Sequence, residues 1–99
     1  DSHGVYPGLV RDLAAAQAVP LVDMQASSAA LLRRLGEQPS RALFLWVPAG
    51  DVNYPKGLQD NTHFSPKGAE VMAGLAVDGL VELRLPLASD LVRRNESTR

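Results

Sequence analysis

The sequence predicts part of an α/β layered fold. Three stretches, residues 6–17, 25–35 and 66–83, repeat apolar side chains at helical spacing, and a short apolar run at residues 19–24 lies between the first two. Helices that alternate with buried strands are typical of proteins in which helices cover a mostly parallel sheet. Because a parallel strand needs neighbours and helices on both faces, the few strands in these 99 residues predict a portion of such a fold.

The first predicted helix, residues 6–17, has Pro7 in its first turn, where a missing backbone N–H costs nothing. The run that follows, residues 19–24, is rich in β-branched and aliphatic side chains and predicts a strand buried on both sides. Pro20 is expected near the beginning of this strand, where the absence of a donor is tolerated.

The second predicted helix, residues 25–35, has candidate inward positions at Ala26, Ala29, Ala30 and Leu32. Asp23 precedes this helix and follows the predicted strand, where ligand sites occur in open α/β sheets. Capping of the helix by the Asp23 carboxylate is the better supported interpretation. Gly36 predicts the end of the helix, since glycine readily adopts the backbone conformation that stops one.

Residues 41–47 fit either a strand or a short buried helix, because periodicity cannot separate the two over so short a run. Residues 51–64 predict a long functional loop, since turn-forming Gly, Asn and Pro residues are frequent there. The third predicted helix, residues 66–83, has Ser65 as its N-cap and Pro66 as its first residue. Its apolar stripe is expected to face a sheet.

The end of the chain predicts little regular structure. Residues 88–94 predict one last turn, and the polar residues 95–99 predict a frayed tail. The predicted domain organisation is therefore a portion of one domain over residues 1–94, followed by a flexible tail at residues 95–99.

The composition excludes several classes of function. The 10 lysines and arginines against 11 acidic residues give no electrostatic basis for binding nucleic acid or an anionic membrane surface. Cysteine is absent, which removes disulfides, thiolate chemistry and cysteine-rich zinc sites. No apolar run approaches the ~20 residues that span a bilayer. Neutral substrates and protein partners remain open, and the composition does not determine the compartment.

The motif with the clearest chemistry is Asp60-Asn61-Thr62-His63. A histidine can act as a general base near neutral pH because its unperturbed pKa is ~6.5, and a neighbouring carboxylate can hold its ring and tautomer. Asp60 is close enough to His63 in the sequence to do this. By spacing alone, the same residues also fit a loop carboxylate and a helix-flanking histidine without chemistry.

This motif resembles the last sequence block of the SGNH (GDSL-type) hydrolases, in which a D-x-x-H pair supplies both the aspartate and the histidine of a catalytic triad. Other segments resemble, in order, the C-terminal half of the rhamnogalacturonan acetylesterase branch: residues 1–7 (DSHGVYP), 19–23 (VPLVD), 42–46 (ALFLW) and 53–57 (NYPKG). The resemblance spans residues 1–83. It implies the C-terminal part of a flavodoxin-like, three-layer α/β/α fold.

Carried onto these positions, the resemblance implies that Asp60 orients His63, and that His63 deprotonates a serine and later protonates the leaving alcohol. The nucleophile of the family lies in a Gly-Asp-Ser block, and its oxyanion donors include a Gly and an Asn; all three precede the part matched here. Ser2 lacks the strand-to-helix setting that projects a nucleophilic hydroxyl. We therefore expect a chain that begins inside a domain, needs a complementary N-terminal half or self-association, and has little esterase activity alone.

The substrate that the resemblance implies is an acetylated carbohydrate, with Tyr54 and Asn61 as candidate substrate contacts. No metal or organic cofactor is implied. Two alternatives stay open. The first is a non-catalytic α/β fragment or self-association module, in which Asp60 and His63 only fasten the last helix. The second is a metal site formed by His3 with this pair, since two histidines and a carboxylate suit a transition metal.

Overall fold

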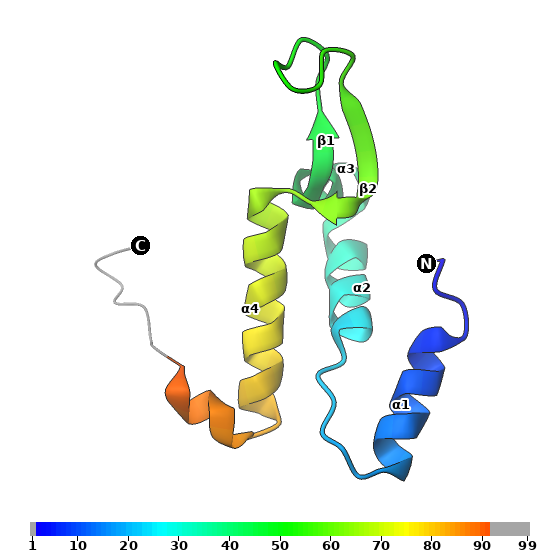
Figure 1. The fold of residues 1–99 in the computed structure, drawn as a ribbon, viewed down its shortest axis with the longest axis vertical. Coiled ribbons are helices and arrows are strands. Elements are labelled where there is room, and N and C mark those ends of the chain that lie inside the picture. Colours follow the sequence, from blue (N-terminus) through cyan, green and yellow to red (C-terminus); the bar gives the residue numbers. More distant parts are fainter. Residues whose placement is uncertain (1, 92–99) are drawn as a thin grey trace. The chain divides into compact units, whose positions relative to one another are not determined.

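The computed structural model describes residues 2–91 (Figure 1). The described residues form two compact units, one with α1, the end of α4 and η2, and the other with Asp23–Leu75. The elements, in chain order, are α1 (Tyr6–Ala16), α2 (Met24–Leu35), α3 (Glu37–Ser40), η1 (Arg41–Leu43), β1 (Phe44–Val47), β2 (Leu58–Phe64), α4 (Pro66–Glu82) and η2 (Pro86–Asp90), where η marks a 3-10 helix.

The structure is mixed α/β, as predicted, and the three predicted helices are present as α1, α2 and α4. At the start of α2, Asp23 Oδ1 accepts the backbone N–H of Ala26 at 3.0 Å. The capping interpretation of Asp23 is therefore confirmed. Gly36 ends α2 with a φ of 84°, a backbone conformation that side chains with a Cβ rarely adopt.

The predicted strand at residues 19–24 is wrong. Residues 19–23 belong to no strand, although all of them lie in the described part of the chain, and Met24 already begins α2. The backbone N–H of Val19 donates to Ala14 O at 2.9 Å, which attaches this segment to the end of α1. A strand exists only where a second strand pairs with it. Apolar composition alone does not supply that partner.

The two strands, β1 and β2, form an antiparallel hairpin, not the parallel arrangement expected from the sequence. Residues 41–47, which fitted either a strand or a helix, divide into η1 and β1. The predicted loop at residues 51–64 is wrong over its second half, because β2 begins at Leu58. The connection at residues 48–57 is shorter than the crossover of about a dozen or more residues that parallel neighbours need.

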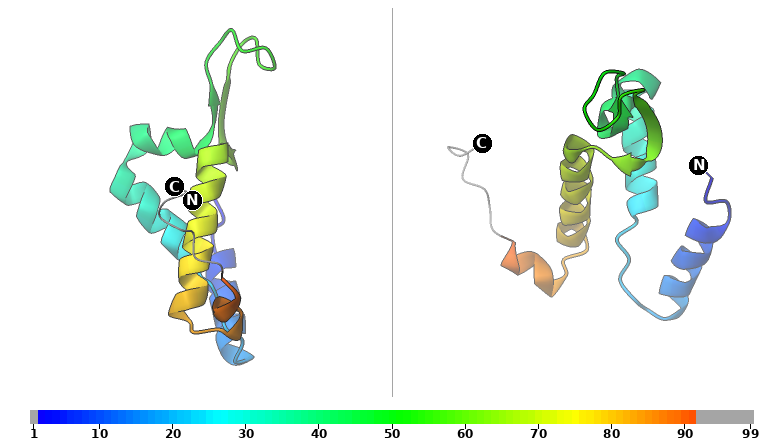
Figure 2. Two further views of the ribbon diagram at one scale, coloured as in Figure 1. Left: turned by 90° about the vertical axis from the view of Figure 1, so that its left-hand side faces the viewer. Right: turned by 45° about the horizontal axis from the view of Figure 1, so that its top comes forward.

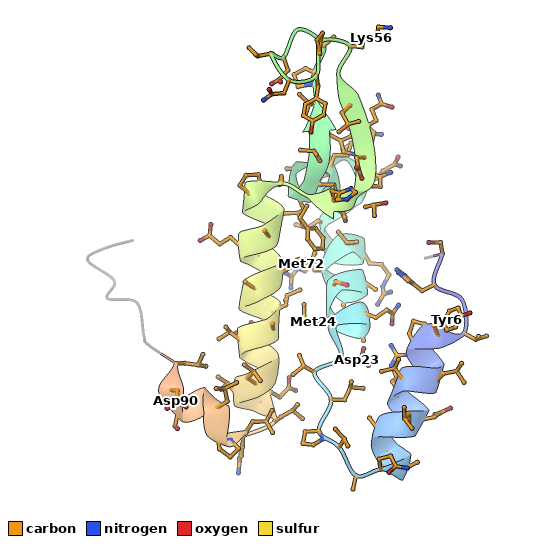
Figure 3. The ribbon with its side chains drawn as sticks, in the orientation of Figure 1. Tyr6, Asp23, Met24, Lys56, Met72 and Asp90 are labelled. Atoms are coloured by element: carbon orange, nitrogen blue, oxygen red, sulfur yellow. The ribbon has the colours of Figure 1, made fainter. Side chains whose placement is uncertain are left out.

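Hydrogen bonds within the hairpin connection hold its shape. Asp51 Oδ1 accepts the backbone N–H groups of Asn53 at 2.8 Å and Tyr54 at 3.2 Å. Gly57 has a φ of 79° and approaches β1 so closely that a Cβ there would lie 2.8 Å from a backbone oxygen of that strand. Figure 2 shows the hairpin projecting beyond the start of α4, and Lys56 lies near its far end (Figure 3).

The start of α4 lies against η1. Ser65 Oγ accepts the backbone N–H of Gly68 at 3.0 Å and donates to Ala42 O at 2.6 Å, so the predicted N-cap is confirmed and is also attached to the preceding turn. Gly68 is buried, and a Cβ at this position would overlap Leu43 O. The absence of a side chain at Gly68 therefore permits the close approach of α4 to η1.

Gly68→Ala is expected to lower the free energy of unfolding, because the added methyl group must displace the Leu43 carbonyl or shift α4. Overpacking of this kind costs ~1–3 kcal/mol. Gly74→Ala is the matched control, because it lies on the same helix with open space at the Cβ position. Urea unfolding followed by circular dichroism should show a lower midpoint for the first variant only. Equal midpoints for the two variants would contradict the close approach.

Few apolar side chains are buried. Within residues 2–91 the buried ones are Leu31 of α2, Leu43 of η1 and Met72 of α4; Met72 is labelled in Figure 3. The predicted inward positions of α2 omitted Leu31, and Ala26 and Ala30 from that set are exposed. Burial stabilises in proportion to apolar area, so the leucine gains more from the inward position than an alanine does.

The remaining predictions concern the membrane and the end of the chain. None of the helices in residues 2–91 is both long enough and apolar enough to span a bilayer. The last turn, predicted at residues 88–94, is present in part as η2, which ends at Asp90. Residues 92–94 and the predicted tail at residues 95–99 lie outside the described residues.

Candidate functional site: a carboxylate and histidine pair in a strand bulge

A bulge in β2 shapes the D-x-x-H motif. The pairing of the hairpin changes register between Phe44, which lies opposite Phe64, and Leu45, which lies opposite Asp60. Residues 61–63 therefore have no counterpart on β1 and form a bulge between two paired positions. Bulges redirect side chains out of a regular ladder and are frequent beside active sites. Here the bulge ends at His63, three residues before α4 begins at Pro66.

Asp60 organises the bulge through both of its carboxylate oxygens. Oδ1 accepts the backbone N–H groups of Thr62 at 2.6 Å and His63 at 2.9 Å. Oδ2 lies 2.8 Å from His63 Nδ1. One side chain thus determines the backbone path to His63 and also contacts its ring, so the structure brings together the two residues expected to act as a pair.

The hydrogen bonds to Asp60 lower its pKa from 3.8 to about 2, chiefly the backbone donors of His63 and Thr62 and then the imidazole of His63. Asp60 is therefore a carboxylate at neutral pH, and a carboxylate can only accept hydrogen bonds. It follows that His63 Nδ1 carries the proton in the 2.8 Å contact. In the neutral ring, Nε2 then holds the lone pair that can accept a proton.

The two side chains differ in exposure in the way that such a pair requires. The His63 side chain is 75% exposed, whereas the Asp60 side chain is 22% exposed. The imidazole is thus open to a reacting group, while the carboxylate is covered on most of its surface and bonded to the bulge. Chemically, this arrangement can accept a proton at Nε2 and stabilise the resulting imidazolium.

The lowered pKa of Asp60 predicts how the bulge responds to acid. The folded state favours ionised Asp60, so this carboxylate contributes to stability above its ordinary pKa of 3.8, and the contribution is lost as the pH falls toward about 2. We expect the carboxyl ¹³C resonance of Asp60 to titrate well below pH 3.8, together with the amide resonances of Thr62 and His63. A midpoint at the ordinary value would contradict the hydrogen bonding described above. Asp60→Asn is the control that removes this titration.

Asn61 and Tyr54, the candidate substrate contacts, lie in different parts of the hairpin. Asn61 is exposed within the bulge, and its Oδ1 accepts the indole N–H of Trp46 at 2.7 Å. Tyr54 is 37% exposed and lies in the connection, where its backbone N–H donates to Asp51. Asn61 is thus part of the segment that carries the pair, whereas Tyr54 belongs to the projecting end of the hairpin.

The contact between Trp46 and Asn61 is a feature of this site that the sequence did not indicate. Phe44 of the same strand packs against Phe64 with ring centroids 5.5 Å apart. Trp46 is only partly buried and instead directs its N–H to the bulge. The pairing register decides this contact, and no local pattern encodes that register.

The metal alternative gains no support from the structure. Nowhere in residues 2–91 do three or more His, Cys, Asp or Glu side chains gather in a way that could hold a metal ion.

A mixed α/β fold with an ionised carboxylate bound to histidine Nδ1 is typical of hydrolases that use histidine as a general base. The chain is 44% identical over 92 residues to rhamnogalacturonan acetylesterase RhgT of Bacillus subtilis (strain 168). The aligned residues make up 92% of this chain and 40% of that relative. It is 32% identical over 84 residues to the probable rhamnogalacturonan acetylesterase YesY of the same strain, covering 85% of this chain and 35% of that relative.

These relatives confirm the resemblance to the rhamnogalacturonan acetylesterase branch. The chain spans about 40% of the length of the first relative. No model of a protein family matches the chain. No solved structure matches it either.

Proposed function

We propose that this chain supplies the aspartate and histidine of a carbohydrate acetylesterase with an SGNH-type fold. The observation that carries the proposal is the 2.8 Å contact between Asp60 Oδ2 and His63 Nδ1, in a chain 44% identical to a rhamnogalacturonan acetylesterase. The observed mixed α/β structure is consistent with an SGNH-type fold, and the names of the relatives support this more specific assignment. In this proposal, the serine nucleophile and the oxyanion donors come from protein outside residues 1–99.

The proposed reaction proceeds through an acetyl-enzyme. His63 Nε2 takes the proton of the serine hydroxyl as the serine oxygen attacks the acetyl carbonyl, and Asp60 stabilises the imidazolium. The tetrahedral intermediate then collapses, and His63 gives its proton to the departing sugar oxygen. Water attacks the acetyl-serine in the second half, with His63 as the base, and acetate leaves as the serine regains its proton.

The proposed substrate is an acetylated carbohydrate, in keeping with the names of the relatives. Asn61 is proposed as a substrate contact, and its exposed position next to Asp60 in the bulge supports this. Tyr54 would contact a part of the sugar chain farther from the reacting ester, since it lies in the hairpin connection. Aromatic rings offer apolar faces with a polar hydroxyl, a combination suited to sugars.

The exposed apolar surface supports a complementary polypeptide as partner. In the unit that contains α1, the side chains of Val5, Tyr6, Leu9, Val10 and Leu13 are between 53% and 72% exposed. An open apolar hollow in the same unit is lined by Val10, Leu13, Ala14, Gln17, Val19, Pro20 and Leu21. Contiguous exposed apolar surface of this kind commonly marks an interface. The proposed partner is the N-terminal half of the same hydrolase domain.

A chimera tests the proposal. The segment of RhgT that matches this chain is replaced by residues 1–99, and hydrolysis of p-nitrophenyl acetate and of acetylated rhamnogalacturonan is measured for the chimera and for the chain alone. The chimera is expected to hydrolyse both substrates, and the chain alone neither. Hydrolysis by the chain alone that survives His63→Ala would contradict the proposed division of the catalytic groups.

The rival function is a self-association module without catalysis, which the same exposed apolar side chains favour. Sedimentation of the chain alone separates the two. A symmetrical oligomer that gains nothing from the rest of RhgT supports the module. A chain that remains unassembled until the complementary half is added supports the esterase.

A further inference from the structure

The bulge in β2 is attached to the neighbouring strand by Trp46 of β1. The indole Nε1 of Trp46 donates to Asn61 Oδ1 at 2.7 Å, across a sequence separation of 15 residues. Trp46 itself is paired with Gln59, one residue before Asp60. The hydrogen bond therefore joins a regularly paired residue to the first residue of the bulge.

The indole N–H of Trp46 determines the orientation of the Asn61 side-chain amide, that is, which of its oxygen and nitrogen atoms faces the ring. An indole nitrogen can only donate a hydrogen bond, so the amide atom 2.7 Å from it must be the oxygen. The Nδ2 group then provides the two hydrogen atoms that Asn61 can offer to a substrate. With the amide held this way, Asn61 would recognise an acceptor, such as a carbonyl or hydroxyl oxygen of an acetylated sugar.

The Trp46 ring is in turn held from η1. The Arg41 guanidinium carbon lies 4.3 Å from the centroid of the ring, a cation–π contact. Arg41 also donates to Gln38 Oε1 at 3.1 Å and to Glu37 Oε1 at 3.3 Å, both on α3. A connected set of side chains thus leads from α3 through Arg41 and Trp46 to the bulge.

We propose that Trp46 is a positioning residue, whose indole N–H holds the Asn61 amide and with it the bulge that presents Asp60 and His63. Within the bulge, the hydrogen bonds of Asp60 hold the backbone at Thr62 and His63. The Trp46 bond holds the bulge against β1, which those internal bonds do not do. The effect of Trp46 on catalysis rests on the proposed function. Its structural role in holding the bulge does not.

Trp46→Phe tests the role, because phenylalanine keeps an aromatic ring for Arg41 and removes the N–H donor together with part of the indole ring. Amide hydrogen exchange of the 99-residue chain is followed by NMR. Exchange at Thr62 and His63 is expected to become about fivefold faster, the factor that corresponds to one ordinary hydrogen bond. Exchange at Asn53 and Tyr54, whose N–H groups bond to Asp51 in the same hairpin, should be unchanged.

Two variants of Asn61 separate the acceptor from the donor. Asn61→Asp keeps an oxygen for the indole N–H and should leave the exchange of Thr62 and His63 nearly as slow as in the parent chain. Asn61→Leu should match Trp46→Phe, with no further change in the double variant, because both remove the same bond. Unchanged exchange in Trp46→Phe would overturn the proposal. An equal increase in the exchange rates at Asn53 and Tyr54 would also overturn it, because it would indicate that the whole hairpin has become less stable.

Kinetics of the active chimera distinguish this proposal from the proposed function. Trp46→Phe is expected to lower kcat about tenfold, as expected for misplacement of a general base, and to raise KM, because the Asn61 amide is released as well. If His63→Ala abolishes activity while Trp46→Phe changes neither kcat nor exchange, only the positioning role is wrong. If exchange changes as expected but His63→Ala leaves activity intact, the proposed function is wrong and the structural role of Trp46 remains.

Discussion

His63→Ala in the active chimera is expected to reduce acetyl ester hydrolysis by about 10⁴-fold or more, because the group that activates the nucleophile and protonates the leaving alcohol is removed. The melting temperature should change little, since the imidazole is 75% exposed and its ring makes one hydrogen bond to Asp60. The measurement is the rate with p-nitrophenyl acetate, together with a thermal unfolding curve for each variant.

His3→Ala is the matched control for this variant. It removes the other histidine of the chain, which lies in a separate compact unit, and is expected to leave the rate within about twofold. Similar losses in the two variants would show that removal of any imidazole disturbs the chimera, and His63 would lose its assigned role. A low melting temperature in His63→Ala alone would favour the rival in which this pair fastens α4.

Asp60→Asn is expected to lower the rate of ester hydrolysis by about 10⁴-fold, because it changes the tautomer of His63. A decrease of this size is found when the aspartate of a catalytic triad is replaced by asparagine. An asparagine Oδ1 can still accept the backbone N–H groups of Thr62 and His63, so the bulge should persist. Its Nδ2 group, however, donates where Asp60 Oδ2 accepts. Nδ1 of His63 must then be the acceptor, and the proton moves to Nε2, where the base is needed.

Asp51→Asn is the matched control for this second prediction. Asp51 Oδ1 also accepts two backbone N–H groups, from the residues two and three positions ahead. Within residues 2–91, no histidine contact of Asp51 accompanies them. The rate should therefore stay near that of the parent chimera. ¹⁵N NMR of the His63 ring should show the proton on Nδ1 in the parent and on Nε2 in Asp60→Asn; an unchanged tautomer with a large loss of rate would contradict this mechanism.

The lowered pKa of Asp60 also separates two ways in which acid could inactivate the chimera. The carboxylate keeps its charge down to about pH 2, so any loss of activity in the mildly acidic range is assigned to a group other than Asp60. Loss of the bulge itself is expected only when Asp60 takes up its proton.

Much of the candidate site could be predicted from the sequence, because its contacts join residues that are close together in the chain. Asp60 and His63 are three residues apart, as are Ser65 and Gly68, and Asp23 and Ala26. Within so short a separation the chain has few conformations, and residue types with a strong capping or turn preference select among them. The resemblance to the relatives then turned a common spacing into a specific hypothesis about chemistry.

The strands were predicted poorly for the opposite reason. Residues 19–24 have the composition of a buried strand but pair with nothing in the described chain, whereas β2, with its polar Gln59 to His63, pairs with β1. Composition measures how well a segment suits a buried sheet. Whether a partner is present depends on segments elsewhere in the chain.

The sequence by itself determined the three main helices, the caps at Asp23 and Ser65, and the closeness of Asp60 to His63, because each depends on residues within a few positions of one another. The tertiary structure alone decided the register of the hairpin, the bulge at residues 61–63, the hydrogen bond from Trp46 and the space available at Gly68. These features join residues from 11 to 25 positions apart. At such separations many pairings compete, and packing selects one of them.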